Sequence, residues 1–278
     1  MAEEFRAAGD DRYKSARDNF PAYVHGLLDG ARGINLHEIS EVCRAFLNGL
    51  TMVLGEKLFG LYIYGAAAFP DSFAIGDIDF HVILKEELTE SERSELYHLH
   101  SSLKENFPPL GGELDGYYIL LEDTRGRLPP KSQMWHGVTD DSWALHCEHI
   151  RAGRCIVLYG PDPTQVYPAM TWDELEKALW GELAYVEEHL GDSPGYCVLN
   201  LCRLMYSFAT NDVVISKAAA AQWAYDAFPE WRHLIELARK SYTRQATPED
   251  RKCMLLEVNN LFRYAYDRIQ QRHEASRL

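Results

Sequence analysis

The sequence predicts an α+β protein with a sheet-containing domain over residues 1–162 and an all-helical domain over residues 163–278. Three observations lead to this prediction. The length of 278 residues favours two domains, since one domain usually takes about 100–200 residues. Apolar runs with strand-like alternation occur before residue 122. After residue 162 the apolar residues recur at helical spacing instead.

The first predicted domain mixes helices and strands. Short apolar runs bounded by Gly or Pro are typical of buried strands, and the apolar, aromatic-rich run that ends at Gly65 is the clearest of them. Thr89, followed by acidic residues, marks a helix start that resembles a capping box. The predicted strands are residues 58–64, 77–84 and 114–121, and the predicted helical segments are residues 1–55 and 89–106.

The second predicted domain begins after a Gly-Pro-Asp-Pro loop at residues 160–163. Thr171 is the N-cap of a helix whose apolar residues Leu175, Leu179 and Leu183 share one face. Further helices are predicted over residues 196–210, 216–228, 231–243 and 248–273.

The charge balance restricts the class of partner. The chain has 42 acidic and 28 basic residues, a net charge of −14 with His neutral. Such a chain repels nucleic acid and anionic lipid, so we expect neither as a partner and favour a cationic ligand. The longest stretch without a charged residue is 13 residues, residues 58–70, and a membrane helix needs about 20. The polar, acidic N-terminus does not resemble a signal peptide, so we expect a cytoplasmic protein. We also expect the protein to be a monomer.

The cysteines and histidines give weaker signals. The six cysteines contain no C-x-x-C pair, which favours free buried thiols over disulfides or a metal site. His146 and His149 lie three residues apart in a helix-like stretch, but two neutral ligands without a third make a poor metal site.

Three acidic residues on predicted strands form the strongest candidate site. Asp77 and Asp79 are two residues apart, so their carboxylates lie on one face, about 6.5–7 Å apart along the strand. Two such carboxylates can hold Mg²⁺, which fills its remaining positions with substrate phosphates and water. Asp115 on the third strand is a candidate to share the metal or to take a proton from an attacking hydroxyl. The small residues from Gly65 to Ala68 let backbone N–H groups approach a phosphate.

Two segments resemble a known family. Residues 62–84 are similar to the nucleotidyltransferase signature of the polymerase-β-like superfamily, a Gly-Ser pair followed by a loop and a D-x-D motif. The series Arg203, Ser216-Lys217, Trp223-Ala and Tyr242 resembles the C-terminal domain of the aminoglycoside 3″/9-type O-adenylyltransferases. The resemblance covers roughly residues 58–270.

The resemblance implies a fold and an activity. The fold is a polymerase-β-like nucleotidyltransferase domain, a mixed sheet flanked by helices, followed by a helical bundle that closes over the nucleotide. The activity is Mg-ATP-dependent transfer of AMP to a hydroxyl of a streptomycin- or spectinomycin-like antibiotic, with release of pyrophosphate. The implied roles are metal binding for Asp77 and Asp79, catalysis for Asp115, nucleotide binding for Gly65, Ala66, Arg203, Lys217 and Tyr242, and substrate binding for Asp192.

The chain departs from the family pattern at several of these positions. Ala66 stands where relatives have a phosphate-binding Ser, Gly76 where they often have a hydroxyl residue, and Asp115 where they have Glu. Two alternatives therefore stay open. The same fold could modify a protein, or the chain could be a catalytically weak nucleotide-binding homologue.

Overall fold

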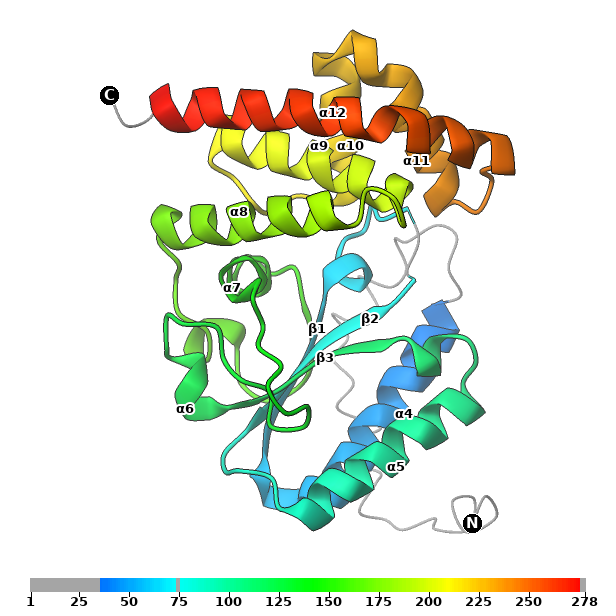
Figure 1. The fold of residues 1–278 in the computed structure, drawn as a ribbon. Coiled ribbons are helices and arrows are strands. Elements are labelled where there is room, and N and C mark those ends of the chain that lie inside the picture. Colours follow the sequence, from blue (N-terminus) through cyan, green and yellow to red (C-terminus); the bar gives the residue numbers. More distant parts are fainter. Residues whose placement is uncertain (1–35, 74–75, 276–278) are drawn as a thin grey trace.

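A computed structural model describes residues 36–73 and 76–275 of the chain (Figure 1). The predicted helical segment 1–55 falls partly outside this range, and its described part is one helix, α4 (Leu36–Leu54). No helix in the described residues is both long enough and apolar enough to span a membrane. The six cysteines are all free thiols, as expected.

A four-stranded mixed sheet forms the centre of the N-terminal half. The strand order is β3-β2-β1-β4, with β2 and β3 parallel and the other neighbours antiparallel. The three predicted strands are confirmed, and the fourth, at the sheet edge, was missed because its four residues are too few to show alternation. The strands are β1 (Leu58–Tyr64), β2 (Ile78–Leu84), β3 (Leu114–Leu120) and β4 (Ile156–Tyr159).

Helices cover both faces of this sheet. On one face α4 packs against α5, which begins at Thr89 with the predicted capping box to Glu92. The other face carries the helix α7, which contacts β1. The bounds are α5 (Glu90–Asn106), α6 (Leu121–Thr124) and α7 (Trp143–Arg151).

The C-terminal half is helical, and no strand occurs in residues 163–275. The helix α8 contacts α7 on one side and α9 on the other, so it lies between the sheet half and the remaining helices (Figure 1). The helix α9 is central and also contacts α10, α11 and α12. The domain boundary near residue 162 falls in the connection between β4 and α8 and stays a prediction. The bounds are α8 (Trp172–Glu188), α9 (Pro194–Thr210), α10 (Lys217–Ala227), α11 (Arg232–Tyr242) and α12 (Pro248–Ala275).

Strand alternation divides the side chains between the two faces. On β1, Leu61 and Ile63 enter the core formed with α4 and α5, whereas Tyr62 and Tyr64 enter a separate aromatic core that includes Trp143 of α7. The face toward α7 is the one that carries the acidic residues described below.

A largely buried histidine, His100 of α5, sits in the first of these cores. Its ring contacts the rings of Phe46, Phe80 and Trp135, and its Nε2 hydrogen-bonds the Tyr118 hydroxyl at 2.8 Å. Burial disfavours the imidazolium and lowers the pKa of His100 to about 4.

This lowered pKa predicts acid destabilisation. Between pH 7 and pH 4 the unfolded chain takes up a proton that folded His100 does not, so the free energy of unfolding falls as the pH falls. Replacement by Phe, which keeps a ring in the aromatic core, removes this contribution, on the order of 3 kcal/mol between the two pH values. Denaturant unfolding at both pH values checks the prediction, and an equal loss in wild type and His100→Phe contradicts it.

Candidate functional site

A cavity of about 1020 Å³ lies between the sheet and the C-terminal helices. The sheet half contributes the turn after β1 and the acidic residues of β2 and β3, while α8, α9, α10 and α11 contribute the opposite wall. Of the residues predicted for the site, those that line the cavity are Gly65, Ala66, Asp77, Asp79, Asp115, Arg203, Lys217 and Tyr242.

Strand register brings the three predicted carboxylates together. Asp79 pairs with Tyr64 of β1 on one side and with Asp115 of β3 on the other. Asp77 comes directly before β2 and is exposed to the cavity. The parallel pairing of β2 and β3 therefore places two acids side by side that are 36 residues apart in the chain.

The electrostatics of this group fit a divalent cation. Burial, followed by the charges of Asp77 and Asp115, raises the pKa of Asp79 to about 7, although His146 and Lys217 act in the opposite direction. Burial and the charge of Asp77 also raise the pKa of Asp115. Carboxylates that destabilise one another in this way are the hard oxygen donors that Mg²⁺ takes. Asp77 and Asp79, with Asp115 beside them, are the residues that would hold it.

The turn after β1 is shaped by one glycine. Gly65 has φ +65°, and a Cβ there would lie 1.7 Å from Oδ2 of Asp79. Only Gly therefore allows the Asp79 carboxylate to lie against this turn. The turn continues as the short helix η3 (Gly65–Ala68), in which Ala66 has no polar side chain, so any ligand bond there comes from the backbone.

Two cations face the acids from the helical wall. Lys217 is the first residue of α10, and its Nζ donates to the Tyr242 hydroxyl at 3.1 Å and lies 4.6 Å from the centre of the Tyr196 ring. Burial, and then the charge of Arg203, lower the pKa of Lys217 to about 8, against the effect of Asp77. Lys217 and Arg203 are two like charges that line one cavity and act on each other, and a positive region of this kind attracts an anion.

A hydrogen bond between Ser216 and Asp71 links α10 to the sheet half. Ser216, the N-cap of α10, donates from its hydroxyl to Oδ2 of Asp71 at 2.6 Å and accepts from the backbone N–H of Ala219. The same hydroxyl thus caps the N-terminus of α10 and fixes the position of Lys217, the first residue of that helix, relative to the segment after β1.

The structure does not place Asp192 in the cavity wall. Its side chain is exposed in the turn between α8 and α9, and its carbonyl oxygen accepts from Arg251 at 2.8 Å. Glu182 of α8 lines the cavity instead, held by a hydrogen bond from the Ser142 hydroxyl. The sequence did carry a signal for Glu182, because it lies at the border of the apolar face of α8, next to Leu183.

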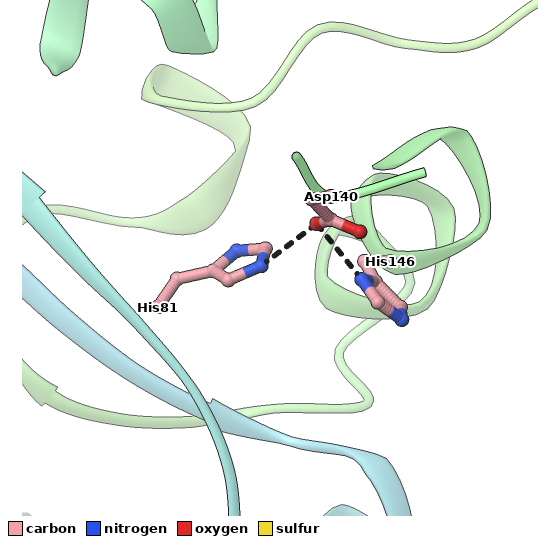
Figure 2. Close-up of side chains that lie close together, drawn as sticks. All are labelled: His81, Asp140 and His146. Carbon is pink, nitrogen blue, oxygen red and sulfur yellow. Dashed lines mark hydrogen bonds and ion pairs between the residues drawn. The ribbon is translucent and has the colours of Figure 1, made fainter. Parts of the chain in front are cut away.

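A buried histidine cluster beside the cavity was not predicted. His81 of β2 and His146 of α7 both donate to Oδ2 of Asp140, over 3.1 and 2.9 Å (Figure 2). The sequence gave no sign of it, since the three residues come from separate segments. The weak candidate pair of His146 and His149 does not form a site, because His149 bonds the Val213 carbonyl at 2.7 Å.

Comparison with known proteins supports the resemblance. Residues 165–268 match the family model for the aminoglycoside adenylyltransferase C-terminal domain. The helical part of this chain is therefore similar to the C-terminal domain of aminoglycoside adenylyltransferases. The resemblance expected from the sequence is confirmed.

Individual relatives agree with this family. A spectinomycin 9-adenylyltransferase of Campylobacter jejuni is 22% identical over 241 residues, 78% of this chain and 90% of that protein. A spectinomycin 9-adenylyltransferase of Staphylococcus aureus is 21% identical, and the match covers 68% of this chain and 80% of that protein. These relatives are nucleotidyltransferases, which bears out the expected enzyme class.

The fold also matches a solved structure of an Enterococcus spectinomycin adenyltransferase, AAD(9), with ATP and spectinomycin. The TM-score is 0.68 at 17% identity, over 83% of this chain and 99% of that one. The predicted fold class, a nucleotidyltransferase domain followed by a helical domain, is thereby confirmed.

The raised pKa of Asp79 predicts a trade between stability and function. A group whose pKa is higher in the folded state costs stability once the pH exceeds its unfolded value of about 4, and the cost is complete above about 7. Asp79→Asn should therefore raise the free energy of unfolding of the metal-free protein at pH 8, on the order of 2 kcal/mol, and by less at pH 5.

Thermal or denaturant unfolding at the two pH values measures this effect. Addition of Mg²⁺ should stabilise the wild type and leave Asp79→Asn unchanged. A variant that is less stable than wild type at pH 8 contradicts the assigned cost.

Proposed function

We propose that this protein is a Mg-ATP-dependent O-adenylyltransferase that transfers AMP to a hydroxyl of an aminoglycoside or aminocyclitol antibiotic and releases pyrophosphate. The observation that carries the proposal is a single cavity with three carboxylates on the sheet wall and Arg203 and Lys217 on the helical wall. That arrangement has the charges for a metal–triphosphate ligand. The names of the relatives, spectinomycin 9-adenylyltransferases, support the substrate class.

The nucleotide phosphates would bind between the two walls. Backbone N–H groups of Gly65 and Ala66 lie beside the carboxylates, and Lys217 acts as a point charge from the other side. Mg²⁺, held by Asp77 and Asp79, would neutralise the phosphate charge when bound. Because Lys217 and Arg203 lie on helices beyond residue 162, both halves of the chain are needed for nucleotide binding.

Asp115 is the candidate general base. It lies across from Asp79 and lines the cavity, and burial and the charge of Asp77 raise its pKa, which makes its carboxylate a stronger base. The substrate hydroxyl gives its proton to the Asp115 carboxylate. The oxygen of the substrate hydroxyl forms a bond to the α-phosphorus of ATP, and the bond from that phosphorus to the departing pyrophosphate breaks.

The substrate is expected to be cationic. Glu182 and Tyr185 of α8 line the cavity away from the sheet and offer an acid and an aromatic ring to an amino sugar. Asp192, exposed just outside this wall, stays a prediction as a further contact.

Asp115→Asn tests the base. We expect ATP and drug binding to persist while kcat falls by about 10²–10⁴-fold, the range for a lost general base. Pyrophosphate release with spectinomycin and streptomycin measures kcat. Glu113→Gln is the control, because Glu113 is exposed and does not line the cavity. If Glu113→Gln loses turnover while Asp115→Asn keeps full activity, the assignment of the base to Asp115 is wrong.

Lys217→Met tests the nucleotide contact. Loss of the ammonium should raise KM for ATP by about 10-fold or more and should affect drug affinity less. The reason is that a cation contributes binding free energy to a phosphate and none to a cationic drug. Titration calorimetry of each ligand separates the two effects. Equal ATP affinity in the variant and wild type would refute the contact.

The same assay decides between the alternatives. No pyrophosphate release with any aminoglycoside or aminocyclitol, but AMP transfer to protein from a lysate, would favour the protein-modifying reading. ATP binding without any transfer would favour a catalytically weak homologue, the reading that the missing side-chain donor at Ala66 motivates.

A further inference from the structure

His146 connects the buried cluster to the cavity. Its side chain is 24% exposed and lines the cavity, while those of His81 and Asp140 are fully buried. Nδ1 of His146 donates to Oδ2 of Asp140, and the second ring nitrogen, Nε2, points away from that bond (Figure 2). The ring also packs against Tyr64, with centroids 4.7 Å apart, directly before the Gly65–Ala68 turn.

The cluster favours the charged form of His146. A buried carboxylate needs a cation, and Oδ1 of Asp140 has no partner among the described residues, so the two imidazoles on Oδ2 are its main compensation. Burial lowers the pKa of His81 and keeps it neutral. Burial also opposes protonation of His146, but Asp140 outweighs it and raises the pKa of His146.

We propose that His146 is a further nucleotide-binding residue, an imidazolium positioned by Asp140 that donates from Nε2 to a phosphate oxygen of ATP. The proposal rests on the proposed function. It gives the sheet side of the cavity a charged donor where Ala66 has no polar side chain. His146 then complements Arg203 and Lys217, which reach the same cavity from the helical wall.

The charge of His146 favours the nucleotide over the drug. A polycationic substrate is repelled by an imidazolium, whereas a triphosphate gains a charge-assisted hydrogen bond. The groups whose charge or ring acts on His146 come from four other elements, one loop and α7 itself: Tyr64 of β1, Asp79 and His81 of β2, Asp115 of β3, Glu182 of α8, Asp140 of the loop and His149 of α7.

The same three side chains are also a donor set for a metal ion. Both imidazoles, however, bond one carboxylate oxygen over 3.1 and 2.9 Å, which is the geometry of N–H···O hydrogen bonds. Ligands of a zinc ion would instead converge on a common point about 2.0–2.2 Å from each donor. We therefore interpret the three side chains as a hydrogen-bonded cluster. The experiment below also measures metal content, which tests the alternative of a metal site.

His146→Asn is the informative variant. The Asn amide can replace Nδ1 as the hydrogen-bond donor to Asp140, but it carries no charge and has no counterpart to Nε2. The full-length protein is titrated with a non-hydrolysable α,β-methylene analogue of ATP in Mg²⁺, and with spectinomycin at saturating analogue. His98→Asn, an exposed residue of α5 outside the cavity, is the matched control.

We expect the analogue to bind His146→Asn about 10- to 100-fold more weakly than wild type, the loss for one hydrogen bond to a charged group. Spectinomycin affinity should change little and His98→Asn should match wild type, whereas the melting temperature of His146→Asn should fall because Asp140 loses its cationic partner. Asp140→Asn should weaken analogue binding as well, because it removes the charge that positions His146.

Three results overturn the proposal. The first is unchanged analogue affinity in His146→Asn. The second is a loss confined to spectinomycin. The third is one equivalent of zinc in the purified wild type, by elemental analysis, that is absent from the variant. Absence of analogue binding in wild type would instead refute the proposed function itself, and this inference with it.

Discussion

Repulsion among three carboxylates at the start of β2 is the constraint on which the rest of the site depends. Burial and the charge of Asp77 raise the pKa values of Asp79 and Asp115, and the charge of Asp115 adds to the effect on Asp79. Such a group is stable only where cations surround it. The cavity wall supplies them from elements that are distant in the chain, Lys217 and Arg203 from the helices and His146 from α7.

Two of these cations, Lys217 and His146, are held in place by hydrogen bonds. Lys217 is fixed by the Tyr242 hydroxyl and by the cap of α10, where the Ser216 hydroxyl also bonds Asp71 of the sheet half. His146 is fixed by a buried carboxylate that is itself bonded to His81. Preorganisation of this kind places charge before the nucleotide arrives, so less ordering is needed on binding.

The two halves of the chain are interdependent for the same reason. The acids lie where β2 and β3 begin, and the cations and aromatic rings of the helical wall lie on α9 and on helices packed against it. The turn after β1 offers no side-chain hydroxyl, since residue 66 is Ala. The buried cluster at Asp140 offers a charged donor at the corresponding side of the cavity.

The sequence by itself determined the local elements and the type of chemistry. Alternation and capping were enough to predict three strands and the helices after residue 162, the latter within two residues at each end, because these patterns depend on neighbours in the chain. The D-x-D spacing likewise placed Asp77 and Asp79 on one face. What escaped was the short edge strand β4, which pairs with a distant strand and has too few residues to show a period.

Only the tertiary structure decided which groups meet. Parallel pairing of β2 with β3 puts Asp115 beside Asp79, and helix packing brings Glu182 rather than Asp192 into the cavity wall. His81, Asp140 and His146 belong to three separate segments, so no spacing in the chain links them. Their contact, and the charge it places beside the nucleotide, exists only because the fold buries a carboxylate where two imidazoles can reach it.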